Sequence, residues 1–132
     1  MILIDTNLFI SYRNEDDSKH KEALEIFKKI SEGNFGEYII SDYIFDEIVT
    51  VCSLRKSHDE AISLGNFLLE NVNILKVTER IFEISWEIFK KNINFSFTDC
   101  TNLGLMKEFG IKKIATFDKD FKKIKEIEVI DR

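Results

Sequence analysis

Apolar residues follow two different periods along this chain. Short aliphatic runs, bounded by polar or turn-forming residues, alternate with longer stretches in which apolar positions recur every three or four residues. Continuous short runs are typical of strands buried on both faces of a parallel sheet, and the longer period is typical of amphipathic helices. The runs predict strands at 1–4, 37–40, 73–77, 113–116 and 128–130.

The stretches between these runs predict helices. The segment Lys19–Ile30 has apolar residues at Ala23, Ile26, Phe27 and Ile30, which form one face of an amphipathic helix. Further helices are predicted after residues that can cap a helix N-terminus. These candidate caps are Asp5–Asn7, Ser41 or Asp42, Ser57 with Glu60, Thr78, and Thr98.

The helical stripes also predict which residues form the core. Gly110 is expected to stop the last long helix, as glycine often does at a helix C-terminus. We expect Trp86 to lie in the core or in a dimer interface. The predicted core-facing residues of the later helices are Ile44, Ile48, Val51, Cys52, Ile62, Leu64, Phe67, Leu68, Ile81, Phe82, Ser85, Trp86, Ile88, Phe89, Leu103, Met106 and Phe109.

The order of the elements predicts the fold class. Strands separated by helical crossovers pair in parallel and are covered by helices on both faces. We therefore expect an α/β protein, a three-layer α/β/α domain with a central parallel sheet of about four to five strands. At 132 residues, without an internal repeat or linker, residues 1–132 are expected to form a single domain.

The composition limits the class of protein and the cellular compartment that we expect. With 44% hydrophobic and 33% charged residues the chain reads as a folded globular protein, and it has no apolar run long enough for a membrane span. An acid at position 5 argues against a signal peptide. Cys52 and Cys100 fall in apolar helical patterns, so we expect buried free thiols and a cytoplasmic location.

Four acidic residues stand at predicted strand ends or helix starts. Asp5 follows the first strand and Asp118 the fourth, while Glu47 and Asp99 lie in the first turns of helices. Ligands of open parallel sheets bind beyond the carboxyl ends of the strands, and helix N-termini tolerate carboxylates. All four are therefore expected to meet at one edge of the sheet.

Converging carboxylates raise one another's pKa, and a divalent cation removes that cost. Because the donors are all oxygens, with no accompanying histidine or cysteine cluster, the expected ion is Mg²⁺ or Mn²⁺ rather than Zn²⁺. Such sites hydrolyse phosphodiester bonds. Taken one at a time, each acid has an ordinary structural explanation, as a helix cap, a turn cap, a helix-dipole partner or an exposed helix residue. Only their joint placement favours a site.

The chain resembles the PIN domains of the toxin type found in VapBC toxin–antitoxin pairs, over essentially its full length. The resemblance is carried by Leu3-Ile4-Asp5-Thr6-Asn7, Ser41 to Glu47, Thr98-Asp99 and Thr116-Phe117-Asp118-Lys119-Asp120-Phe121. It implies a Mg²⁺- or Mn²⁺-dependent ribonuclease that forms homodimers and is neutralised by a cognate antitoxin. It also implies the acidic set Asp5, Glu47, Asp99 and Asp118, with Asn7 and Thr116 orienting the acids.

Two positions in this pattern leave a choice open. Asp120 either binds metal with Asp5, Asp99 and Asp118 or only shapes its loop. Asp46 is adjacent to Glu47, but helical geometry turns it about 100° away. We prefer Glu47, because it lies beside the core residue Ile48 and has the family's spacing from Ser41. The chain departs from the family after the third acid, Asp99. Small residues usually follow that acid, and here the following residues are Cys100-Thr101-Asn102.

Other features allow weaker interpretations. The net charge of −5 argues against a large polyanion-binding face, although bound metal would change the local sign. Phe95 and Phe97 are expected to be buried rather than to stack on bases, and His20 and His58 to lie at the surface. Six lysines near the C-terminus form either a solvated surface or a phosphate-contacting rim: Lys112, Lys113, Lys119, Lys122, Lys123 and Lys125.

Three functions of different classes are compatible with an acidic α/β domain of this kind. The first is the metal-dependent endoribonuclease, and the second is a PIN-like RNA-binding or scaffolding module with little turnover. The third is an aspartyl-phosphate protein, which Asp5-Thr6-Asn7 disfavours because it lacks the second acid of an Asp-x-Asp-x-Thr loop.

Overall fold

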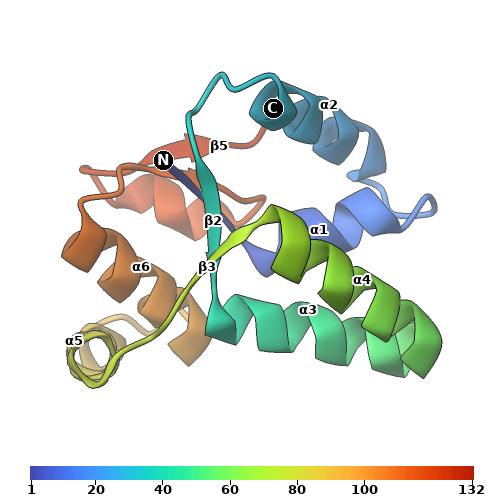
Figure 1. Ribbon diagram of the computed structural model, residues 1–132. Helices are drawn as coiled ribbons and strands as arrows, with labels where there is room; N and C mark the ends of the chain where they lie inside the picture. Colours follow the sequence, from blue (N-terminus) through green and yellow to red (C-terminus); the bar gives the residue numbers. More distant parts are fainter.

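Five parallel strands form one sheet at the centre of the molecule (Figure 1). A computed structural model describes residues 1–132. The strand order is β3-β2-β1-β4-β5, so β1 is central and pairs with both β2 and β4. The strands are β1 (Ile2–Ile4), β2 (Tyr38–Ser41), β3 (Asn73–Leu75), β4 (Lys113–Ala115) and β5 (Glu128–Ile130).

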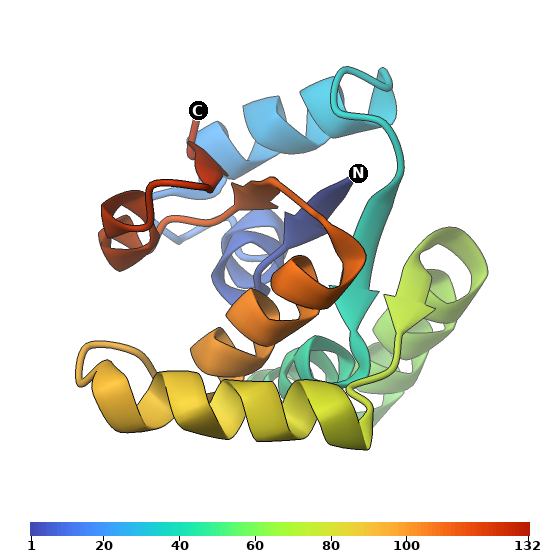
Figure 2. The ribbon, with the colours of Figure 1, turned by 90° about the vertical axis from the view of Figure 1, so that its left-hand side faces the viewer.

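Helices cover both faces of this sheet, which confirms the predicted three-layer α/β/α fold (Figures 1 and 2). Helices α1 and α2 lie on one side of it and α5 and α6 on the other, while α3 and α4 pack together below the end of β2 (Figure 1). The helices are α1 (Thr6–Arg13), α2 (His20–Ser31), α3 (Asp42–Arg55), α4 (His58–Asn71), α5 (Glu79–Lys91), α6 (Phe97–Phe109) and the short 3-10 helix η1 (Lys119–Lys123). None of them is both long and apolar enough to cross a membrane.

The central strand is fully buried, as its aliphatic sequence predicts. Ile2, Leu3 and Ile4 are each inaccessible to solvent and belong to one continuous apolar core. Ile39 and Ile40 of β2 and Ile114 of β4 extend that core to the neighbouring strands. A rigid, buried strand therefore leads directly to Asp5 at the carboxyl edge.

Several predicted helix caps are present. Ser41, Ser57 and Thr78 each accept a hydrogen bond from the backbone N–H three residues later, at 3.0 to 3.2 Å. Gly110 ends α6 in the left-handed conformation, with φ of 67°, which favours glycine. The predicted cap of α6 was wrong: the N-cap is Ser96, two residues before Thr98, because Ser96 forms a reciprocal capping box with Asp99.

The predicted core was wrong at the outer sides of α4, α5 and α6. On α4 the buried residues are Ala61, Leu64, Gly65 and Leu68, because these line the side that packs against the protein. Cys100 is buried as expected, whereas Cys52 is half-buried, and both are free thiols. Trp86 is 48% exposed, so it is not in the core, and the alternative of a dimer interface stays a prediction. The other residues expected in the core but exposed are Ile62 (49%), Phe67 (52%), Phe82 (46%), Phe89 (36%) and Phe109 (45%).

Candidate active site at the carboxyl edge of the sheet

The predicted acids come from four separate segments around the carboxyl end of β1. Asp5 directly follows β1, and Asp118 follows β4, the neighbour of β1 on one side. Glu47 lies on α3, which begins where β2 ends, and Asp99 lies in the first turn of α6. Segments far apart in the sequence thus reach one edge of the sheet.

Asp5 is the buried centre of this edge. It is 5% exposed and acts as the N-cap of α1, with its Oδ1 accepting a 2.8 Å hydrogen bond from the Thr6 backbone N–H. Its Oδ2 accepts a 2.7 Å bond from the hydroxyl of Thr116. Longer contacts come from the side-chain amides of Asn7, at 3.3 Å, and Asn102, at 3.4 Å. Donors on three sides therefore fix the carboxylate orientation.

Asn7 and Thr116 join the loop after β1 to the loop after β4. The Asn7 amide donates to Thr116 Oγ1 at 3.1 Å, and its Oδ1 accepts from the Phe117 backbone N–H at 3.1 Å. Thr116 Oγ1 also accepts from the backbone N–H of Asp118, at 3.0 Å. The buried Thr116 hydroxyl thus links Asp5 to the segment that carries Asp118. The supporting role expected for Asn7 and Thr116 stays a prediction.

Burial raises the pKa of Asp5 to about 6. The loss of solvation is the largest cause, and the negative charges of Asp99 and Glu47 add to it. Hydrogen bonds from Thr116 and Thr6 act in the opposite direction, because they stabilise the ionised form. The folded protein therefore holds a carboxylate that is costly to ionise without a nearby positive charge.

The structure separates Glu47 from its neighbour Asp46. Glu47 is half-buried, and its Oε1 accepts a 2.7 Å hydrogen bond from Thr6 Oγ1, next to Asp5. Asp46 is exposed and accepts from Thr50 on its own helix, at 3.3 Å. Glu47 is therefore the acid of this pair that faces the Asp5 edge, which is the orientation that helical geometry predicts.

Asp99 is half-buried and closes the first turn of α6. Its Oδ2 accepts from the Ser96 backbone N–H at 3.0 Å, while the Ser96 hydroxyl accepts from the Asp99 N–H at 3.1 Å. Burial raises the pKa of Asp99, the bonds with Ser96 lower it, and the charges of Asp118 and Asp120 raise it further. The structural explanation of Asp99 as a helix-start acid is thus correct, and the residue is also close enough to Asp118 and Asp120 for their charges to act on it.

Asp118 and Asp120 form the fourth side of the site. Asp118 is the N-cap of η1, and its Oδ1 accepts from the Asp120 backbone N–H at 2.9 Å. Asp120 in turn contacts Lys123 Nζ at 2.9 Å. Their packing is set by Phe121, which is fully buried and lies 5.1 Å from the ring of Phe95. The predicted burial of Phe95 is confirmed, at 6% exposure.

The acids are brought near one another, but their oxygens do not converge on one point. No three Asp, Glu, His or Cys side chains are placed to hold a common metal ion. The reason is visible in their partners: Glu47 is turned to Thr6, Asp99 to Ser96 and Asp118 to the Asp120 N–H. The metal set Asp5, Asp99, Asp118 and Asp120 stays a prediction, and these acids would have to turn to share an ion.

Three polar residues at the site were not predicted. Thr6 binds Glu47, Ser96 binds Asp99, and Asn102 reaches Asp5 from the second turn of α6. Asn102 is fully buried, and its Oδ1 has no hydrogen-bond partner. In the sequence, Asn102 was noticeable only because it replaces one of the small residues that usually follow the third acid. The sequence did not show that its side chain points toward Asp5.

A comparison with protein families fits this geometry. Residues 2–127 match the model of the PIN domain. The chain belongs to the PIN-domain family. The match extends from β1, which leads to Asp5, to beyond η1, so it includes all four segments that carry the acids.

Two curated relatives are named as VapC nucleases. A VapC ribonuclease of Archaeoglobus fulgidus is 25% identical over 122 residues, which cover 90% of this chain and 78% of the relative. The 23S rRNA-specific endonuclease VapC20 of Mycobacterium tuberculosis is 27% identical over 124 residues, which cover 92% of each. The predicted resemblance to VapC-type PIN domains is therefore confirmed.

Solved structures share the fold. The crystal structure of Mycobacterium tuberculosis VapC20, a sarcin-ricin loop cleaving toxin, aligns over 95% of both chains with a TM-score of 0.80 and 24% identity. VapBC-1 of nontypeable Haemophilus influenzae aligns over 99% of this chain and 98% of the other, with a TM-score of 0.73 and 18% identity. The three-layer PIN fold thus extends over nearly the whole chain.

The C-terminal lysines do not form a single rim around this PIN site. Lys112 and Lys113 stand at the start of β4, at the opposite end of the sheet from the acids, and Lys122 pairs with Asp131 at 2.6 Å. Lys119 and Lys123 lie on η1 beside Asp118. The six lysines are close in the sequence, but they do not form one cluster in the structure.

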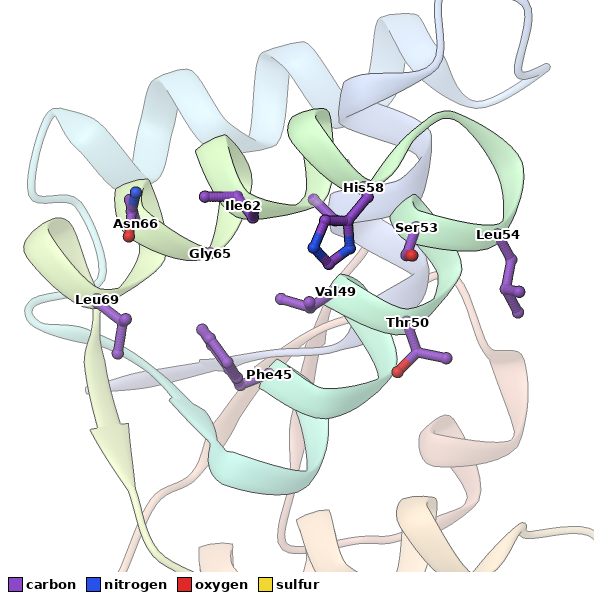
Figure 3. A pocket seen from close by; sticks show the side chains of 11 residues that line it. Phe45, Val49, Thr50, Ser53, Leu54, His58, Ile62, Gly65, Asn66 and Leu69 are labelled. Atoms are coloured by element: carbon purple, nitrogen blue, oxygen red, sulfur yellow. The ribbon is translucent and has the colours of Figure 1, made fainter.

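One pocket of this PIN domain lies between α3 and α4, away from the acids. It is a hollow of about 430 Å³ between α3 and α4, lined by apolar side chains such as Phe45, Val49 and Ile62, with His58 near one end (Figure 3). None of the four main pockets is lined by Asp5, Asp99 or Asp118. The acids are presented at the sheet edge rather than inside one of these hollows.

Proposed function

We propose that this PIN domain is a Mg²⁺- or Mn²⁺-dependent endoribonuclease. The observation that carries the proposal is the meeting of Asp5, Glu47, Asp99 and Asp118, from four separate segments, at the carboxyl edge of the central strand. Asp5 is buried there with a raised pKa, although most buried acids are paired with a cation. The ribonuclease names of the curated relatives support the same activity.

The donor set fits a hard divalent cation. Asp5, Asp99, Asp118 and Asp120 offer only carboxylate oxygens, and neither histidine lies among them. A bound Mg²⁺ or Mn²⁺ would activate water and stabilise the charge that develops on the phosphate. Thr116, Asn7 and Thr6 hold Asp5 and Glu47 in fixed orientations.

RNA is the proposed substrate in spite of the net charge of −5. The bound cation would supply positive charge at the phosphate, and lysines beside the site add more. Lys119 and Lys123 lie on η1 next to Asp118. The Nζ of Lys19 lies 5.8 Å from the ring centroid of Phe117, the residue that precedes Asp118. These cations can contact phosphates that flank the cleaved bond.

The names of the relatives also support a partner. We propose that the protein is the toxin of a toxin–antitoxin pair and acts as a homodimer neutralised by a cognate antitoxin. Several structural neighbours are described as complexes, including a toxin–antitoxin complex of Klebsiella pneumoniae. The free thiols Cys52 and Cys100 fit a cytoplasmic location, where cysteines stay reduced.

One observation favours the second candidate, an RNA-binding or scaffolding module. Asp99, Asp118 and Glu47 already accept hydrogen bonds from their own chain, and no three acids are arranged around a common ion. A module with little turnover would keep this arrangement with metal present.

Metal removal separates the two candidates. Purified protein is expected to cleave an RNA pool that includes 23S rRNA when Mg²⁺ or Mn²⁺ is present, and to stop when EDTA is added. Restoring the metal in excess of EDTA should restore cleavage. Binding of the same RNAs without metal-dependent cleavage would support the scaffolding module instead.

Two adjacent acids provide a matched pair of variants. Glu47→Gln should lower the cleavage rate by roughly 10- to 100-fold, because an acid that faces the site loses its charge while keeping its shape. Asp46→Asn removes the same charge one residue away, on the exposed side of α3, and should leave the rate within about twofold. The measurement is single-turnover cleavage of one labelled RNA, with circular dichroism to show that both variants fold.

A further inference from the structure

Asn102 uses only one of the two ends of its buried amide. The residue lies in the second turn of α6, is inaccessible to solvent, and donates from Nδ2 to Asp5 Oδ1 at 3.4 Å. Its Oδ1 is buried as well but accepts no hydrogen bond. One other buried side-chain atom of the molecule lacks a partner, Glu22 Oε2, and it belongs to a half-buried residue of α2. The unpaired oxygen of Asn102 is therefore the one in the interior beside the acids.

Asn7, the other amide that reaches Asp5, uses both ends. Its Nδ2 donates to Asp5 Oδ2 at 3.3 Å and to Thr116 Oγ1 at 3.1 Å. Its Oδ1 accepts from the Phe117 backbone N–H at 3.1 Å. Asn7 thus joins two loops of the protein. An amide in Asn102 that served only to link segments of the chain would have a partner at its oxygen too.

The contact with Asp5 does not by itself explain an amide at this position. A buried carbonyl oxygen without a hydrogen bond destabilises the folded state, and such atoms are rare in native proteins. The bond from Asn102 is the longest that Asp5 receives. The Thr6 N–H and the Thr116 hydroxyl are closer to the oxygens of Asp5, at 2.8 and 2.7 Å. The unpaired oxygen therefore points to a partner that is not part of the chain.

That partner has to be a small hydrogen-bond donor, because a carbonyl oxygen only accepts. Water is such a donor, and buried water is held where two to four polar groups surround it. Mg²⁺ usually keeps several of its waters when carboxylates bind it, and a donor polarised by a charge makes a stronger hydrogen bond. A hydrated cation at Asp5 would therefore bring donors to the amide that has an unused acceptor.

The other acceptors around Asp5 are already in use. Asn7 Oδ1 is taken by a backbone N–H, and Glu47 and Asp99 each accept a hydrogen bond from their own chain. Asn102 Oδ1 is the neutral acceptor that no group of the chain occupies. It is also held firmly, because every residue of α6 from 100 to 106 is buried. A water bound there would have a fixed orientation.

We propose that Asn102 is a positioning residue for the cation of the proposed nuclease site. Its Nδ2 holds Asp5, and its Oδ1 accepts a hydrogen bond from a water of the hydrated Mg²⁺ or Mn²⁺. The inference rests on the proposed metal-dependent function and adds to it a residue outside the acidic set. The position at which this chain departs from the usual small residue would then contribute to metal binding.

The Mn²⁺ affinity of Asn102→Leu tests this role without RNA. Leucine keeps the approximate size of the side chain and removes both polar ends, so the dissociation constant for Mn²⁺ should rise about 10- to 100-fold. Asn102→Ser should keep the constant within about fivefold, because its hydroxyl can accept from water and the space left can hold one more. Electron paramagnetic resonance of free Mn²⁺ during a titration measures the constants, at a temperature where circular dichroism shows each variant to be folded.

Thr101→Val is the matched control. Thr101 precedes Asn102 on α6, is equally inaccessible to solvent, and donates to the Thr98 carbonyl at 2.6 Å. The helix turns by about 100° between the two residues, so this variant loses a buried polar group on the side away from Asp5. It should lower the urea midpoint of unfolding and leave the Mn²⁺ constant within about twofold.

Two results would overturn the proposal and leave the nuclease function standing. They are an Asn102→Leu protein that binds Mn²⁺ as tightly as the wild type, and a Thr101→Val protein that loses as much affinity as Asn102→Leu. The second result would assign the effect to the packing of α6. A wild type that binds Mn²⁺ with the expected dependence on Asn102 but cleaves no RNA would contradict the proposed activity alone. A wild type that binds no Mn²⁺ would contradict both the proposed cofactor and this role.

Discussion

Asp5→Asn is expected to abolish cleavage and, at neutral pH, to make the metal-free protein more stable. Activity should fall at least about 100-fold. Mutation of a residue that only orients a metal ligand already lowers activity by about 10- to 100-fold, and Asp5 is proposed to be a ligand itself. Stability should rise because the ionised side chain is buried among other acids and has a raised pKa. Asparagine keeps the shape and removes the charge.

The gain in stability should depend on pH, with a sign fixed by the direction of the shift. Because the pKa of Asp5 is higher in the folded state, at about 6, the folded protein binds its proton more tightly than the unfolded chain. The wild type is therefore favoured at low pH, and this contribution is lost as the pH rises from about 4 to about 6. Above that range the buried charge costs on the order of 3 kcal/mol, and the variant avoids this cost.

The difference in the free energy of unfolding between the wild type and Asp5→Asn can be measured by urea unfolding at about pH 4 and about pH 7.5, with EDTA present. The advantage of the variant should be small at the lower pH and roughly 2–3 kcal/mol larger at the higher one. Added Mn²⁺ should stabilise the wild type and not the variant, since a ligand stabilises only the state that binds it. Equal stabilisation of both proteins by Mn²⁺ would remove Asp5 from the metal site.

Thr116→Val is expected to produce the second-largest effect without touching any acid. Valine matches the shape of threonine but cannot donate to Asp5 Oδ2 or accept from Asn7 and the Asp118 N–H. Cleavage should fall roughly 10- to 100-fold, and the free energy of unfolding should drop by about 1–3 kcal/mol, because buried polar groups lose their partner. Loss of the Thr116 bond should also raise the pKa of Asp5 further, which moves the acid limb of the pH–rate profile to higher pH.

Thr116→Ser separates positioning from packing. Serine restores the hydroxyl and loses only a buried methyl group, so activity should stay within a few-fold while stability falls by about 1 kcal/mol. If the serine variant is as inactive as the valine variant, then the hydroxyl is not what positions Asp5.

The sequence predicted the parts of the fold that local pattern determines. The aliphatic runs located all five strands, and the capping residues Ser41, Ser57 and Thr78 located the starts of α3, α4 and α5. Both features could be predicted because strand burial and helix capping depend on residues that are close in the sequence. The sequence did not predict which side of α5 faces the protein. Phe82, Trp86 and Phe89 fit an amphipathic stripe as well as Ile81 and Ser85 do, and only the position of α6 decides between them.

The same limit applies to the candidate site. Placing the acids at one sheet edge needed only their positions relative to strand and helix ends. The preference for Glu47 over Asp46 rested on the neighbouring core residue Ile48 and on the family's spacing from Ser41. The contacts of Thr6 with Glu47 and of Asn102 with Asp5 span 41 and 97 residues, so they depend on packing that no local pattern specifies. For the same reason the sequence did not show that the carboxylates would be turned toward their own chain.

The inward turn of these carboxylates would oppose metal loading. The Ser96 N–H and the Asp120 N–H occupy one oxygen each of Asp99 and Asp118, and an ion held through those same oxygens would displace both hydrogen bonds. At about 1 kcal/mol for each bond, two displacements would weaken the apparent affinity by roughly 30-fold. The caps that complete the first turns of α6 and η1 would then also set how much metal the proposed site needs.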